Sequence, residues 1–214
     1  MKTSYAQMSR YKYPFYIMLH PFDGFAELKY NKKGCTPLAV LFVFLWYVIE
    51  VFSRTATDFA FNQNRADRID LRMIALLTIA LFLLAVVANW CFSTFLDGKG
   101  TMKEIFTAGA YCLLPMMMTS AAATVLSWVL VSGEEAFLTY LTLFGQLWSV
   151  IMIIAAVQEI HDFNFPRTMV MICFTIVGVV LMLFLGFLVY SLAQQVVMFV
   201  FNFTYELIYR ISMS

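Results

Sequence analysis

Five stretches of the chain are each long and apolar enough to cross a lipid bilayer as a helix, and this feature restricts the possible folds most. A span requires about 20 mostly apolar residues, because the hydrocarbon core is about 30 Å thick and an α-helix rises about 1.5 Å per residue. The stretches that meet this requirement cover residues 37–53, 72–95, 105–131, 137–160 and 168–190. We therefore predict an all-α fold, a polytopic membrane helical bundle with five transmembrane helices.

Composition excludes a soluble domain and several classes of function. Of the 214 residues, 62% are hydrophobic and 13% are charged, whereas soluble domains have about 45–50% and about 25%. The net charge of +1 provides no basic field for nucleic acid. The four cysteines are scattered without a CxxC pair, and the chain contains no phosphate-binding loop and no HExxH or GxSxG motif. We expect no nucleic-acid partner, no cofactor and no metal site.

In the sequence, one further segment is expected before the membrane domain and one after it. Residues 1–36 mix aromatic, proline and charged residues, which is typical of a cytoplasmic or interfacial arm, and residues 37–190 hold the five spans. Residues 191–214 place polar side chains on one helical face, which predicts an amphipathic, interfacial C-terminal helix. Because a straight helix from 168 to 201 would exceed the bilayer thickness, we expect a bend near residues 191–195.

The distribution of basic residues predicts how the chain is oriented in the membrane. Nine of the 14 Lys and Arg residues lie in segments on the same side as the N-terminus, and five lie on the other side. Because cytoplasmic segments retain Lys and Arg, we expect the N-terminus in the cytoplasm and the C-terminus outside.

Polar and small residues inside the spans indicate where the helices meet. Asn89 lies well inside the second span, so its amide is expected to bond to a neighbouring helix, and Gln146 is predicted as a second buried amide. Pro115 removes a backbone hydrogen bond within the third span and is expected to kink it. Small and polar residues recur at helical spacing along three spans and predict packed faces there: Ala85, Asn89 and Ser93; Ala108, Cys112, Pro115, Thr119 and Ala122; Gly145, Ser149, Met152, Ala156 and Glu159.

Ionisable residues gather at the end of the fourth span, where Glu159, His161 and Asp162 are close in sequence. Two interpretations are open: a proton-linked or partner-docking site, or a helix end that meets water. One histidine with flanking carboxylates is a weak ligand set for a metal. The sequence offers no paired nucleophile and base, so we predict that the protein is not an enzyme.

Several short segments follow one another in a particular order: 21–30 (PFDGFAELKY), 88–90 (ANW), 96–106 (LDGKGTMKEIF), 110–115 (AYCLLP) and 159–161 (EIH). With the five spans, their order and spacing resemble the Yip family of five-span membrane proteins, named for binding Ypt/Rab GTPases, and specifically its short bacterial branch. The resemblance covers nearly the whole chain. It implies a helical bundle with a cytoplasmic N-terminus in a bacterial plasma membrane.

The eukaryotic relatives that this family includes have roles in ER–Golgi vesicle traffic, membrane shaping and Rab binding. This chain has only residues 1–36 before its first span and lacks the long polar region that those relatives usually carry. We therefore expect no Rab-type GTPase as a partner.

The function expected first is a non-enzymatic scaffold or an accessory to another membrane complex, in contact with the bilayer and with a membrane-protein partner or a second copy of the chain. The alternative is a transporter or channel component, for example an accessory of an ABC-type importer, with a polar path near Asn89, Gln146 and Glu159. The candidate residues for partner contact or a polar site are Asn89, Gly98, Lys99, Gly100, Tyr111, Pro115, Glu159 and His161.

Overall fold

The computed structural model describes residues 12–58, 61 and 69–213, and this part of the chain is helical with no strand. Residues 1–11 of the predicted arm lie outside the described residues. Five helical segments are long and apolar enough to cross a membrane, which confirms the predicted fold. They are Thr36–Ala56, Leu71–Leu96, Met102–Leu126, Glu135–His161 and Phe165–Glu206.

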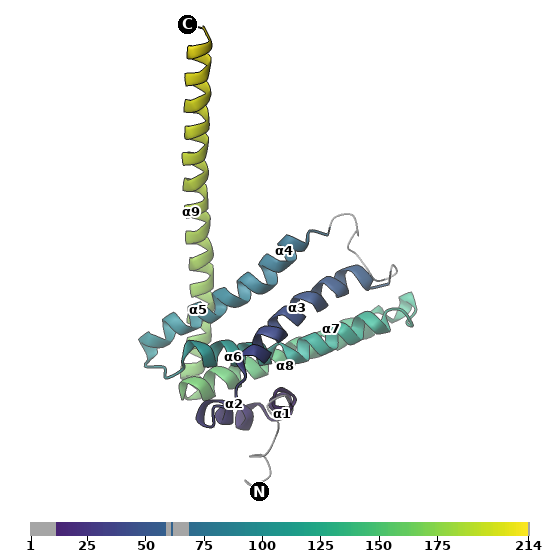
Figure 1. Cartoon of the computed structure of the whole chain (residues 1–214). Coiled ribbons are helices and arrows are strands. Elements are labelled where there is room, and N and C mark those ends of the chain that lie inside the picture. Colours follow the sequence, from purple (N-terminus) through teal and green to yellow (C-terminus); the bar gives the residue numbers. More distant parts are fainter. Residues whose placement is uncertain (1–11, 59–60, 62–68, 214) are drawn as a thin grey trace.

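Several spans are divided into shorter helices, as Figure 1 shows. The second span contains a π-helical turn, Leu76–Ala80, and the third span is broken in its middle. The helices are α1 (Tyr13–Leu19), α2 (Pro21–Tyr30), α3 (Thr36–Ala56), α4 (Leu71–Ala75), α5 (Leu81–Ser93), α6 (Met102–Cys112), α7 (Leu114–Leu126), α8 (Glu135–His161) and α9 (Phe165–Met213).

Successive spans run in opposite directions, so the loops that connect them lie in turn at the two ends of the bundle. The N-terminal helices lie at one of these ends. There, α1 and α2 lie beside the start of α3, residues 97–101 and the turn between α8 and α9 (Figure 1); we call this the N-terminal end of the bundle. At the opposite end, the indole nitrogen of Trp128 donates to the carbonyl of Ala56 at 2.6 Å.

The two short N-terminal helices form a hairpin that packs along α8, from its end to Trp148 at its middle, and against α6. Tyr13 and Phe25 are buried, and the hydroxyl of Tyr13 donates to the carbonyl of Gly24. Burial raises the pKa of Tyr13, so the phenol stays protonated as this bond requires. The indole nitrogen of Trp148 in α8 donates to the carbonyl of Met18 at 2.9 Å. The hairpin is thus attached to the fourth span by a specific hydrogen bond.

Pro115 breaks the third span, where the sequence predicts a kink. α6 ends at Cys112 and α7 begins at Leu114, because the proline has no N–H with which to continue the helix. The N–H of Met116 donates to Ser149 of α8 at 3.3 Å, so a neighbouring helix provides a bond at the break.

One predicted packing face is corrected near the end of α7. Pro115 is buried as expected, but Ala122 is exposed, and Ala123 and Thr124 are buried in its place. Pro115 and Ala122 both lie in α7, so the turn at Leu113 rotates them together. The neighbouring helices cover the face of Pro115 at the start of α7 and the face of Ala123 and Thr124 near its end.

The predicted bend near residues 191–195 is wrong: α9 continues without interruption for 49 residues. At about 1.5 Å per residue it is about 73 Å long, more than twice the hydrocarbon thickness of about 30 Å. Residues 191–195 (SLAQQ) include neither Pro nor Gly, so no local feature ends the helix. From Leu183 to Glu206, every side chain that the structure describes is exposed except Ser191.

Candidate functional site

The loop between the second and third spans packs tightly against the end of α8. Asp97 adopts a left-handed conformation with φ 56°, and the N–H of Gly98 donates to the carbonyl of Ser93 at 2.8 Å. A Cβ atom at Gly98 would lie 2.6 Å from Nδ1 of His161, and one at Gly100 would lie 2.6 Å from Cγ2 of Ile160. The close approach of the loop therefore requires glycine at both positions.

His161 is buried at the end of α8, where it meets this loop. Its ring stacks on Phe163, with the centroids 5.2 Å apart. Nδ1 accepts from the N–H of Gly100 at 3.4 Å, and Nε2 lies 2.9 Å from the side-chain oxygen of Asn89. Because Nδ1 accepts, the hydrogen-bond pattern assigns a neutral imidazole whose Nε2–H donates to Asn89.

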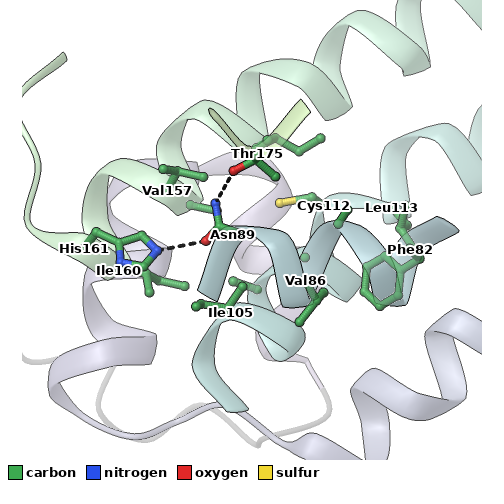
Figure 2. A pocket seen from close by; sticks show the side chains of 15 residues that line it. Phe82, Val86, Asn89, Ile105, Cys112, Leu113, Val157, Ile160, His161 and Thr175 are labelled. Carbon is green, nitrogen blue, oxygen red and sulfur yellow. Dashed lines mark hydrogen bonds between the residues drawn. The ribbon is translucent and has the colours of Figure 1, made fainter. Parts of the chain in front are cut away.

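Asn89 extends this chain of hydrogen bonds to the fifth span. Its amide nitrogen donates to the hydroxyl of Thr175 at 3.1 Å, and Thr175 donates to the carbonyl of Met171 at 2.8 Å. Figure 2 shows Asn89 between His161 and Thr175. The prediction that Asn89 bonds to a neighbouring helix is confirmed, and it bonds to two: α8 and α9. We call Asn89, Gly98, Gly100, His161 and Thr175 the junction.

An ion-pair cluster at the surface lies next to the junction. The carboxylate of Asp162 lies 2.7 Å from Nζ of Lys29 and 3.3 Å from Nζ of Lys99, and it accepts from the hydroxyl of Tyr30 at 2.8 Å. The bond from Lys29, joined by those from Tyr30 and Lys99, lowers the pKa of Asp162 to about 2. The hydrogen bond from Tyr30 to Asp162 also raises the pKa of Tyr30. The cluster connects α2, the 97–101 loop and the end of α8.

A cavity of about 160 Å³ lies beside the junction, bounded by α5, α6, α8 and α9. Asn89, His161 and Thr175 line one end of it, and Phe82 and Leu113 line the other (Figure 2). Among the described residues that line the cavity, none is Asp, Glu, Lys or Arg.

Most of the predicted site residues lie at the junction or beside it. Asn89, Gly98 and Gly100 each lie against His161, Lys99 pairs with Asp162, and the carbonyl of Glu159 accepts from Lys29 at 3.4 Å. The sequence indicated neither Lys29 nor Tyr30 as a partner of Asp162, because 130 or more residues separate them and no local pattern connects them.

Two predicted site residues lie apart from the junction. Tyr111 is buried near the start of α3, where its hydroxyl accepts from the N–H of Cys35 at 3.1 Å and its ring packs edge-on against Phe42 at 5.8 Å. Pro115 lies at the break of the third span, between α6 and α7. Both residues position helices and do not face the polar groups of the junction.

The prediction that Gln146 is a second buried amide is wrong, because Gln146 is exposed. Its neighbour Gly145 is buried, and one residue along an α-helix is a rotation of about 100°. Gln146 therefore faces outward on α8 and is not part of the junction. Within the described ranges, no three His, Cys, Asp or Glu side chains group as metal ligands.

The fold and the junction define a multi-pass helical membrane protein whose spans are joined at one end by side-chain hydrogen bonds. A family model described as the Yip1 domain matches residues 15–203, so the chain belongs to the Yip1 domain family. This confirms the family that the sequence motifs predicted, while the bacterial branch stays a prediction. No significant match to the chain was found among curated proteins or among solved structures.

Proposed function

We propose that the protein is a non-enzymatic membrane scaffold or accessory subunit that presents the N-terminal end of its bundle to a membrane-protein partner. The observation that carries this proposal is that hydrogen bonds and ion pairs between side chains hold the helices and the loop at this end together. The His161–Asn89–Thr175 chain connects α8, α5 and α9, while Asp162 connects α8 to α2 and to Lys99. A fixed surface of this kind suits docking better than it suits gating.

The side chains on this surface support contact with a polar partner. Lys32, Lys99, Lys103 and Arg167 are exposed there. Because cytoplasmic segments retain Lys and Arg, we place this end in the cytoplasm, and the partner would approach from that side of the plasma membrane.

A transporter or channel component is the second function, and it requires polar residues to line one path. Asn89 lines the cavity, but Gln146 is exposed on the outer face of α8. Glu159 is half-buried near Lys29. The separation of these residues favours the scaffold.

Site-specific photocrosslinking of the full chain in its native membrane tests the proposal. A photoreactive residue at Lys103, exposed at the N-terminal end, is expected to form a protein adduct of one discrete mass. The same residue at Glu135, exposed at the opposite end of α8, is the matched control and should not form it. Equal adducts from both positions, or lipid adducts alone, would contradict docking at the N-terminal end. Ion or sugar flux in liposomes that Glu159→Gln abolishes would favour the transporter.

A further inference from the structure

We propose that the cavity bounded by α5, α6, α8 and α9 binds a hydrocarbon chain that ends in an uncharged hydrogen-bonding group, such as an ester, an amide or a hydroxyl. The site is separate from the docking surface of the proposed function, because it lies within the spans.

The size of the cavity matches part of one hydrocarbon chain. Its volume is about 160 Å³, and an apolar cavity of about 150 Å³ accepts a molecule of the size of benzene, or about six carbon atoms. Asn89 at one end and Phe82 at the other are two turns apart on α5, about 10 Å at about 1.5 Å per residue. A single chain fits this length.

The direction of the cavity matches the direction of a lipid in a bilayer. His161 is the last residue of its span, and Asn89 lies about two turns from the end of its own. Phe82 and Leu113 lie near the middle of the second and third spans. The polar end of the cavity is thus close to the membrane surface and the apolar end is close to the midplane, as are the ester and the tail of a lipid.

The polar end selects an uncharged group. No Lys or Arg is among the described residues that line the cavity, and the hydrogen bonds of His161 fit a neutral ring. An ionised phosphate or carboxylate in this place would be buried without a counter-charge, which is costly. The amide nitrogen of Asn89 carries two N–H groups and Thr175 accepts one of them. The other is the donor for an ester, amide or hydroxyl oxygen.

Photolabelling of the full chain in phosphatidylcholine liposomes tests the site. In one arm, a small fraction of the phosphatidylcholine carries a diazirine within about six carbons of the ester of one acyl chain, the part that the cavity can hold. In the other arm, a free long-chain alcohol carries the diazirine at the same distance from its hydroxyl. We expect label on residues 82–89 and 108–113 in excess over residues 183–190, although the latter are exposed on all sides. Excess label from the first probe identifies a membrane phospholipid as the ligand, and from the second alone a free single-chain amphiphile.

Two variants separate a bound chain from ordinary contact with lipid. Ala85 lines the cavity and is half-buried, so Ala85→Phe fills it and should lower the excess label about tenfold. Ala122→Phe is the matched control on an exposed position and should leave the label unchanged. If Ala85→Phe does not fold, Ala85→Leu replaces it. Label that follows exposure alone, strongest on residues 183–190 and equal in all variants, would overturn the proposal.

Discussion

The junction and the exposed part of α9 (residues 183–206) show two ways in which one chain meets a membrane. At the junction, a buried imidazole, a buried amide and a hydroxyl bond to one another across three spans. In this part of α9, the side chains are mostly apolar and point outward, and over most of its length no other helix that the structure describes lies beside them (Figure 1). Because lipid is as apolar as these side chains, apolar surface alone does not bring spans together. At the junction, polar contacts and close packing against glycine hold the helices in place; the exposed part of α9 has no such contacts to another described helix.

The largest difference between the two regions is expected from one substitution made in each. In Gly100→Ala, the new Cβ would lie 2.6 Å from Cγ2 of Ile160 and 2.8 Å from Cε1 of His161. We expect the free energy of unfolding to fall by about 1–3 kcal/mol, the usual cost of overpacking. In Gly186→Ala, the new Cβ meets nothing within 4 Å, so the better helix propensity of alanine should raise stability by up to about 1 kcal/mol. Unfolding in mixed micelles titrated with SDS measures both, and changes of the same sign would remove the contrast.

A second prediction compares two asparagines. Asn89→Ala leaves the Nε2–H of His161 and the hydroxyl of Thr175 without their partner, so we expect a loss of about 0.6–1.7 kcal/mol, the range of polar contacts between membrane helices. Asn202 is exposed in α9, and Asn202→Ala should change stability by less than about 0.5 kcal/mol. The same SDS titration compares the two. Equal losses would show that the junction contributes nothing beyond an exposed amide.

The smallest effect is expected from the surface cluster and depends on pH. The pKa of Asp162 is lowered to about 2 in the folded protein, below the usual value of about 3.9. Its ion pairs therefore contribute stability above pH of about 4, and this contribution is lost as the pH falls towards about 2. Because solvent screens the pairs, we expect less than about 1 kcal/mol.

Asp162→Asn is the variant that tests this effect. Asn also tolerates the left-handed conformation, with φ 58°, that residue 162 adopts, so the backbone is kept. Thermal unfolding of the wild type and of the variant should differ at pH of about 6 and converge near pH of about 2. A constant difference over this range would contradict the assigned role of Asp162.

The spans and several polar contacts were predictable because they depend on local pattern. Apolar length alone predicts five spans. Pro115 predicts a kink where the structure has a break in the third span, and an amide within a span must find a partner, as Asn89 does. Packing faces were predictable only where the same neighbours follow a helix along its length. Ala122 is exposed although it shares a face of α7 with the buried Pro115, because the neighbouring helices cover Ala123 and Thr124 there instead.

Other features depend on contacts between distant segments or on how the chain meets its surroundings. Lys29 and Asp162 are far apart in sequence, so no spacing indicates their pair. The continuous α9 differs from the prediction because bilayer thickness argues for a bend, whereas the local sequence contains no residue that ends a helix. Gln146 was expected to be buried because it is polar, but the position of Gly145 against α7 turns it outward.

A double-mutant cycle between Asn89 and His161 tests the junction most directly. Asn89→Ala and His161→Phe are made singly and together, and the free energy of unfolding is measured for all four proteins. If the two side chains bond to each other as the structure has them, the effects should be non-additive by about 1 kcal/mol, while the cycle of His161→Phe with Asn202→Ala should be additive. A coupling between Asn89 and His161 within about 0.3 kcal/mol of zero would contradict the account.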